Sequence, residues 1–165
     1  DFSIMDHLLG PKARALSAHG SGHFNTGLED VAYVIVHYDN NLMAHFHVNW
    51  LSPVKVRRTI LGGSKKMLLW DDLNMEERIK VYDKGMEVET KEGMYQILAT
   101  PRHGAMHAPV VPGVEALYAE IDYMARCLES RERPFNDGQA GLRMVRLLEA
   151  TDASLRENGR LVELA

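Results

Sequence analysis

Two adjacent stretches constrain the fold of this chain more than any other part of its sequence. Residues 29–39, EDVAYVIVHYD, form a nearly continuous run of β-branched and aromatic residues, which is typical of a strand. Asn40-Asn41 is a tight-turn signal, and residues 42–51, LMAHFHVNWL, then alternate between apolar and polar side chains. The pattern predicts an antiparallel hairpin with one buried and one semi-polar face. The buried face would carry Ala44, Phe46, Val48 and Trp50, and the semi-polar face His45, His47 and Asn49.

Other elements can be predicted on both sides of this hairpin. Residues 1–10, DFSIMDHLLG, favour a short amphipathic helix with Asp1 at its N-cap, which Gly10-Pro11 ends. A strand is expected in residues 12–23 before the hairpin. Two further hairpins are expected after it, in residues 54–72 around Gly62-Gly63 and in residues 79–90 around Lys84-Gly85. The middle of the chain is therefore expected to be an antiparallel meander.

The last third of the chain has a helical period instead. Residues 112–130 place an apolar stripe on one helix face, formed by Val114, Leu117, Ile121, Met124 and Leu128. A second helix is expected in residues 138–158, capped by Asn136 or Asp137, with Leu142, Val145, Leu148 and Leu155 facing inward. Residues 160–164 suit an edge strand. Strands followed by helices predict an α+β fold, with an open, mostly antiparallel sheet and helices packed on one face. The other face would remain available for contact with another subunit.

The composition is that of one ordinary globular domain covering residues 1–165, with 45% hydrophobic and 25% charged residues. A net charge of −4 argues against nucleic-acid and anionic-membrane partners. Cys127 is the single cysteine, which excludes an internal disulfide and fits a reducing compartment. No apolar run reaches the length of a membrane span. We therefore expect a cytoplasmic protein.

Neither a metal site nor a nucleotide-binding loop is expected in this chain. His45 and His47 share one strand face, with His37 on the neighbouring strand, so a metal-dependent enzyme is one hypothesis. No further ligand stands at a convincing spacing, and we predict no metal. Gly20, Gly22 and the residues around them lack the spacing and the βαβ context of a dinucleotide fingerprint.

Two stretches suit a substrate site. Trp50 and Lys55 flank Pro53, and an aromatic ring beside a cation can hold a sugar ring next to an anionic group. An exposed basic strand edge explains the same residues equally well. Residues 99–113 are expected to form a long irregular loop that contains Arg102 and His107. Such loops often line sites, and the alternative is a simple connector.

In this order, residues 1–10, 29–72, 79–85 and 133–164 resemble the C-terminal domain of the Gfo/Idh/MocA oxidoreductases. This is the family of glucose–fructose oxidoreductase and inositol dehydrogenase, and the resemblance covers nearly the whole chain. NWLSPVKVRR and GGSKKMLLWDD are most similar to members that act on nucleotide-linked sugars in surface-polysaccharide pathways.

The resemblance implies an N-terminal Rossmann domain that binds NAD or NADP, outside this sequence. In the family a helix begins with His-Asp, and that His is a catalytic acid/base. Asp1 matches the Asp of the pair, so the His would lie just before it, and we expect no catalytic residue within the chain. Ser3 stands where many members have Asp. Asp1 would position the His, and by residue type and loop position Trp50, Lys55, Arg102 and His107 would line the substrate pocket.

The resemblance thus implies the substrate-side and oligomerisation domain of an NAD(P)-dependent sugar or sugar-nucleotide dehydrogenase. The full enzyme would pass a hydride from a ring hydroxyl to the nicotinamide, and this chain alone would bind no cofactor and be inactive. The sheet face would make a homo-oligomer. The alternative is a stand-alone oligomerising or sugar-binding module without catalysis.

Overall fold

The computed structural model describes residues 1–165 except 11–12, 25–26, 84, 90–97, 103 and 165. The chain divides into two compact units, one made of Asp1–Pro53 with Asp122–Ala165 and the other of Val54–Ile121. Helices and antiparallel sheets occur together, which confirms the predicted α+β class, although the strands form separate sheets rather than one. None of the helices in the described residues is long and apolar enough to cross a membrane.

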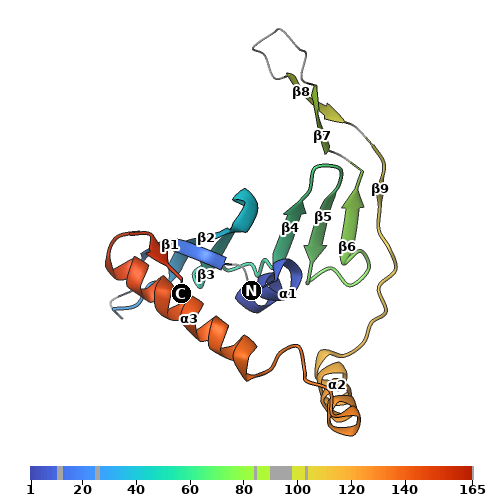
Figure 1. Ribbon diagram of the computed structural model, residues 1–165. Helices are drawn as coiled ribbons and strands as arrows, with labels where there is room; N and C mark the ends of the chain where they lie inside the picture. Colours follow the sequence, from blue (N-terminus) through green and yellow to red (C-terminus); the bar gives the residue numbers. More distant parts are fainter. Residues whose placement is uncertain (11–12, 25–26, 84, 90–97, 103, 165) are drawn as a thin grey trace. The chain divides into compact units, whose positions relative to one another are not determined.

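The first unit contains a four-stranded antiparallel sheet in the order β10-β1-β2-β3 (Figure 1). Its strands are β1 (Ala13–Ser21), β2 (Val31–Tyr38), β3 (Met43–Asn49) and β10 (Val162–Glu163). The predicted hairpin is confirmed, because β2 and β3 pair in a register that places Val34 opposite Phe46 and Ile35 opposite His45. Asn40 and Asn41 both have a φ of +58° in the turn between them, a conformation that asparagine tolerates better than most residues.

One face of this sheet is buried under two helices, α1 (Phe2–Leu9) and α3 (Gly138–Arg156). The core is formed by Leu16, Ala18, Val34, Val36, Tyr38, Leu147 and Ala150. Helix α3 lies along β1 (Figure 1). Helix α1 buries Met5, and its Phe2 ring meets Phe46 edge-on with 4.9 Å between ring centroids. The period-2 pattern of the strands therefore directs their apolar residues to α1 and α3.

A hydroxyl group ties α3 to β1 and to the turn that follows the helix. Ser154 is fully buried, and its Oγ accepts a hydrogen bond from the Ala18 N–H at 2.8 Å and donates one to the Arg160 carbonyl at 2.7 Å. The turn that follows needs glycine. Gly159 has a φ of +89°, and a Cβ at this position would lie 1.9 Å from Cε1 of His19. The turn thereby leads the chain from α3 back to β1, where β10 completes the predicted edge strand.

The predicted inward faces of the two long helices were wrong in part. Helix α3 buries Leu147, Ala150, Thr151 and Ser154, whereas Leu142, Val145 and Leu148 are exposed and Leu155 is partly buried. The stripe of α2 (Ala116–Ser130) is exposed too, with 62–71% of Leu117, Ile121, Met124 and Leu128 accessible. Val114, before this helix, is also exposed. Helix α3 carries apolar residues on two faces, and small residues such as Ala150 and Ser154 allow the closer approach to the sheet.

The second unit holds β4 (Arg58–Gly62), β5 (Met67–Asp71), β6 (Ile79–Tyr82) and β9 (Met106–His107) in one antiparallel sheet. The β4–β5 hairpin around Gly62-Gly63 is confirmed. The hairpin predicted around Lys84-Gly85 is wrong, because β7 (Gly85–Glu89) pairs with β8 (Leu98–Arg102) and not with β6. Residues 99–113, predicted to be an irregular loop, contain part of β8 and all of β9.

Two side chains near the end of the first hairpin were predicted to face the core, but both are exposed. Val48 is 41% accessible and Trp50 is 89% accessible. Strand β3 ends at Asn49, whose Oδ1 accepts a hydrogen bond from the Leu51 N–H at 2.6 Å. The turn begins there, so the alternation of the strand does not extend to Trp50.

We expect Ser154→Ala to lower the free energy of unfolding by about 2–4 kcal/mol, because it leaves the Ala18 N–H and the Arg160 carbonyl without their partner. Chemical denaturation monitored by circular dichroism measures this change. Ser64→Ala, at an exposed position, is the matched control and should shift stability by less than about 0.5 kcal/mol. Equal effects of the two substitutions would show that Ser154 does not tie α3 to the sheet.

Candidate functional site

The first candidate site is a cavity of about 410 Å³ in the first unit. Its lining includes Ser3, Asp6 and His7 from α1, Phe135 and Asn136 from the segment before α3, and Arg143 from α3. Asp6 and His7 lie three and four positions after Ser3, so each shares a helix face with it. The volume falls within the range of small-molecule sites.

The entry into α3 is fixed by an N-cap. The Asp137 carboxylate accepts hydrogen bonds from the N–H groups of Gln139 and Ala140, each at 2.9 Å. The Ala140 hydrogen bond in particular, and then the contact with Arg133, lower the pKa of Asp137. This confirms one of the two predicted caps, and it holds the first turn of α3 beside the cavity.

One wall of the cavity is charged. Arg143 Nη2 donates to Asp6 Oδ2 at 2.8 Å, and Arg143 Nε lies 3.3 Å from both carboxylate oxygens. This ion pair joins α1 to α3. The Asp6 side chain is 15% exposed, so its carboxylate is largely shielded from solvent. Tyr38 belongs to the core of the same unit. The burial of its hydroxyl is the main cause that raises its pKa, and the negative charge of Asp6 is the second. A carboxylate held this way keeps lone pairs free for further hydrogen bonds.

Aromatic side chains line the cavity as well. The rings of His7 and Phe135 have centroids 4.9 Å apart, and Tyr123 lies 5.2 Å from Phe135. The Tyr123 hydroxyl accepts a hydrogen bond from the Phe135 N–H at 3.0 Å, which fixes the segment before α3. Rings in the same cavity as a carboxylate–guanidinium pair can bind a polar ring through its apolar face and its hydroxyl groups together.

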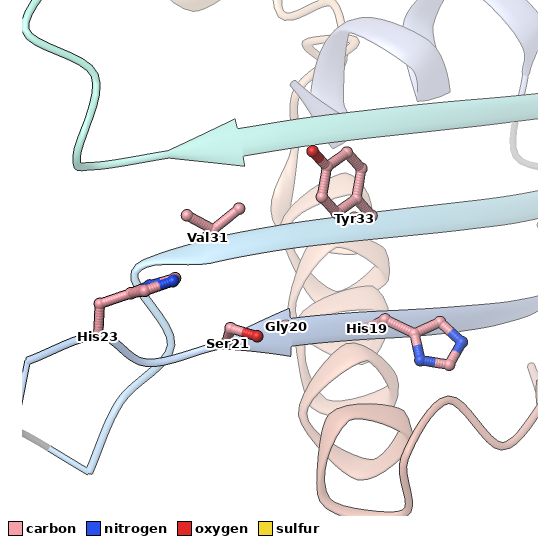
Figure 2. Close-up of a pocket in the computed structure, with 6 residues that line it drawn as sticks. All are labelled: His19, Gly20, Ser21, His23, Val31 and Tyr33. Carbon is pink, nitrogen blue, oxygen red and sulfur yellow. The ribbon is translucent and has the colours of Figure 1, made fainter.

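A smaller cavity of about 190 Å³ lies where β1 ends and β2 begins (Figure 2). Figure 2 shows His19 and His23 at opposite ends of it, with Val31 and Tyr33 between them. His23 Nδ1 lies 2.7 Å from Asp30 Oδ1, and Asp30 Oδ2 accepts the backbone N–H groups of His23 and Phe24. The bond with the His23 ring lowers the pKa of Asp30 most. This carboxylate organises the connection between β1 and β2.

The sheet face opposite α1 and α3 carries exposed side chains. We call six of these residues the open face: His19, Tyr33, His37, Met43, His45 and His47. Cross-strand register places His19, Tyr33 and His47 in one row. The rings of Tyr33 and His47 are stacked at 4.5 Å with 9° between their planes. No group of three ligating side chains that could hold a metal ion occurs in the part of the chain that the structure describes.

The structure places the predicted substrate residues in different units. Asp1 precedes α1, where its carbonyl accepts the N–H groups of Ile4 and Met5, and its side chain makes no capping hydrogen bond. Trp50 also lies in the first unit, with its N–H bonded to the Asp30 carbonyl at 2.9 Å. Lys55, Arg102 and His107 lie in the second unit, and the side chain of Arg102 is outside the described part. That the five residues line one pocket stays a prediction.

Most residues of the larger cavity were not predicted as site residues from the sequence. Of its lining, only Ser3 was related to a site, through the family resemblance. One signal was available, since Ser3, Asp6, His7 and Gly10 form a polar and small stripe on an otherwise apolar helix. The contribution of Phe135 and Arg143 depends on tertiary contact across more than 120 residues and has no local signal.

We expect Asp30→Asn to reduce stability in a pH-dependent way. The pKa of Asp30 is lowered on folding, so its contribution is complete above the ordinary carboxyl pKa of about 3.9 and is lost as the pH falls through the folded value. The stability difference between wild type and variant should therefore be larger at pH 5 than at pH 2.5. Denaturant unfolding at both pH values tests this. Asp152→Asn, on the exposed side of α3, should show no such dependence, and a constant difference for Asp30→Asn would contradict the expectation.

Comparison with known proteins supports the resemblance seen in the sequence. A family model described as the GFO/IDH/MocA C-terminal domain matches residues 1–69. No curated protein matches the chain. Among solved structures, UDP-N-acetylglucosamine 3-dehydrogenase from Acidithiobacillus ferrooxidans is similar with a TM-score of 0.74 and 18% identity, over 95% of this chain and 46% of that protein.

Two further structures agree. Aldose-aldose oxidoreductase from Caulobacter crescentus, complexed with glycerol, has a TM-score of 0.72 at 19% identity, over 99% of this chain and 44% of its own. WlbA dehydrogenase from Bordetella pertussis, in complex with NADH and UDP-GlcNAcA, has a TM-score of 0.65 at 17% identity, over 99% of this chain and 42% of its own. The chain thus spans less than half the length of these proteins. Its N-terminal 69 residues match the GFO/IDH/MocA C-terminal domain, and nearly the whole chain has a fold similar to part of these oxidoreductases.

Proposed function

We propose that this chain is the substrate-side and oligomerisation domain of an NAD(P)-dependent sugar or sugar-nucleotide dehydrogenase. In the parent enzyme a hydride would pass from a ring hydroxyl of the substrate to the nicotinamide. The observation that carries the proposal is the family match over residues 1–69, together with fold similarity over 95–99% of the chain to oxidoreductases of about twice its length.

The residues described here do not fit a nicotinamide dinucleotide. Every strand pairing among them is antiparallel, whereas a dinucleotide fold needs a parallel βαβ unit. Gly20 lies within β1 and Gly22 directly after it, and the next described element along the chain is strand β2 rather than a helix. In our proposal the cofactor is therefore held by another part of the parent enzyme, and this chain contributes to the substrate side.

The 410 Å³ cavity is the proposed substrate-binding site of this chain. Phe135 and His7 would stack on the sugar, while the Asp6–Arg143 pair and Asn136 would bind its hydroxyl groups. The α1 helix begins at Phe2, two residues after the position where the resemblance implies the catalytic His. A sugar against α1 would accordingly be near that residue.

The open face is the proposed contact between copies of the chain. Tyr33 and Met43 are 53% and 57% exposed there, between polar histidines. An exposed surface that mixes large apolar and polar side chains is typical of a protein contact. The mixture is also compatible with an isologous interface, in which the same face meets itself.

We expect Phe135→Ala in the complete parent enzyme to raise KM for a UDP-sugar at least tenfold, about 1.4 kcal/mol, because one stacking ring is removed. NADH formation with UDP-N-acetylglucosamine and with other sugar nucleotides and free sugars as substrates measures this. Phe24→Ala, at an equally exposed phenylalanine outside the cavity, should leave KM unchanged. If the parent enzyme forms no NADH or NADPH with any of these substrates, the proposed function fails.

We expect the chain to form dimers at neutral pH and Tyr33→Arg to be monomeric, because an unpaired charge would be buried at the interface. Size-exclusion chromatography with light scattering measures the mass of each. Tyr118→Arg, at an exposed tyrosine of α2, is the matched control and should remain a dimer. A monomeric wild type, or a dimeric Tyr33→Arg, would contradict the proposed interface.

A further inference from the structure

Helix α2 carries two partly buried residues on one face. All residues of Ala116–Ser130 are exposed except Tyr123 and Cys127, which are partly buried. These two lie four positions apart and therefore share a helix face. Both belong to the first unit, and it is this face, through Tyr123, that meets the segment before α3. The exposed apolar stripe of α2 does not make this contact.

Tyr123 contacts Phe135 in two ways. Its hydroxyl oxygen accepts a hydrogen bond from the Phe135 N–H at 3.0 Å. Its ring centroid lies 5.2 Å from that of Phe135, with 42° between the two ring planes. The Phe135 ring is also 4.9 Å from the ring of His7 in α1. Phe135 lines the 410 Å³ cavity, whereas Tyr123 does not belong to that lining and contacts it only through Phe135.

Phe135 lies in a part of the chain that regular structure does not hold. It stands in a turn between α2 and α3, directly after Pro134, and is 61% exposed. The cap at Asp137 fixes the backbone only from two residues further on. An aromatic side chain in such a segment has several conformations open to it unless a contact selects one. The hydroxyl and the ring of Tyr123 provide that contact for Phe135.

We propose that Tyr123 is a positioning residue for substrate binding, whose hydroxyl holds Phe135 in the orientation in which that ring stacks on a sugar. This inference rests on the proposed function, in which Phe135 belongs to the substrate site. A ring that is ordered beforehand loses less conformational freedom when the sugar binds, so Tyr123 strengthens binding without touching the substrate. Because the contact is the same in the ground state and the transition state, its loss should raise KM and leave kcat unchanged.

Tyr123→Phe tests the inference in the complete parent enzyme, because it removes the hydroxyl and keeps the ring. With UDP-N-acetylglucosamine, or with another of the sugars tested on Phe135→Ala if that one is oxidised faster, we expect KM to rise about fivefold, which corresponds to one ordinary hydrogen bond. The value of kcat should stay within about twofold. Tyr118→Phe, at a tyrosine of α2 that is 67% exposed, is the matched control and should leave both constants unchanged. The double variant Tyr123→Phe with Phe135→Ala should have the KM of Phe135→Ala alone, because Tyr123 acts through that ring.

The outcomes separate this inference from the proposed function. If Phe135→Ala raises KM and Tyr123→Phe does not, the positioning role is overturned and the proposed substrate site stands. The role is also overturned if the two effects on KM multiply in the double variant, since Tyr123 then does not act through Phe135. A lower kcat at unchanged KM would indicate a general loss of active enzyme and overturn it as well. If Phe135→Ala leaves KM unchanged, or if no sugar is oxidised, the proposed substrate site fails and the inference fails with it.

Discussion

The packing of α3 on β1 is the contact on which the rest of the first unit depends. Ser154 is fully buried there and hydrogen-bonds both Ala18 of β1 and the carbonyl of Arg160. This places the turn at Gly159 against His19 and brings β10 beside β1. Because a buried hydroxyl is tolerated only with its partners in place, the contact fixes the position of α3 along the sheet as well as its distance from it.

Two consequences for function follow from that placement. The start of α3 meets α1, where Asp6 and Arg143 pair and the 410 Å³ cavity forms, so the proposed substrate site is built from both ends of the chain. The opposite side of the sheet remains uncovered in this unit, and it presents the histidine-rich open face. Because both helices pack on one side of the antiparallel sheet, the proposed ligand site and the proposed partner contact lie on opposite sides of it.

The local parts of this structure could be predicted from the sequence, and the long-range parts could not. The β2–β3 hairpin, the Gly62-Gly63 hairpin, the Asp137 cap and the limits of α1 each follow from patterns within a few residues. The inward face of α3 was mistaken because that helix has apolar residues on two sides, and only the sheet decides between them. The partner of β7 was mistaken because Lys84-Gly85 was interpreted as a hairpin turn, whereas Gly85 is already the first residue of β7, which pairs with β8. The candidate cavity unites residues far apart in sequence, so resemblance identified only Ser3.

The measurement that tests the central claim most directly is the coding sequence immediately upstream of Asp1. If the chain is the substrate-side domain of a dehydrogenase, that sequence should encode a Gly-rich cofactor loop, a Glu-Lys-Pro motif and a His codon directly before Asp1. A start codon at or just before Asp1 would contradict the account. The cell would then make this domain alone, and self-association or sugar binding without hydride transfer would be its function.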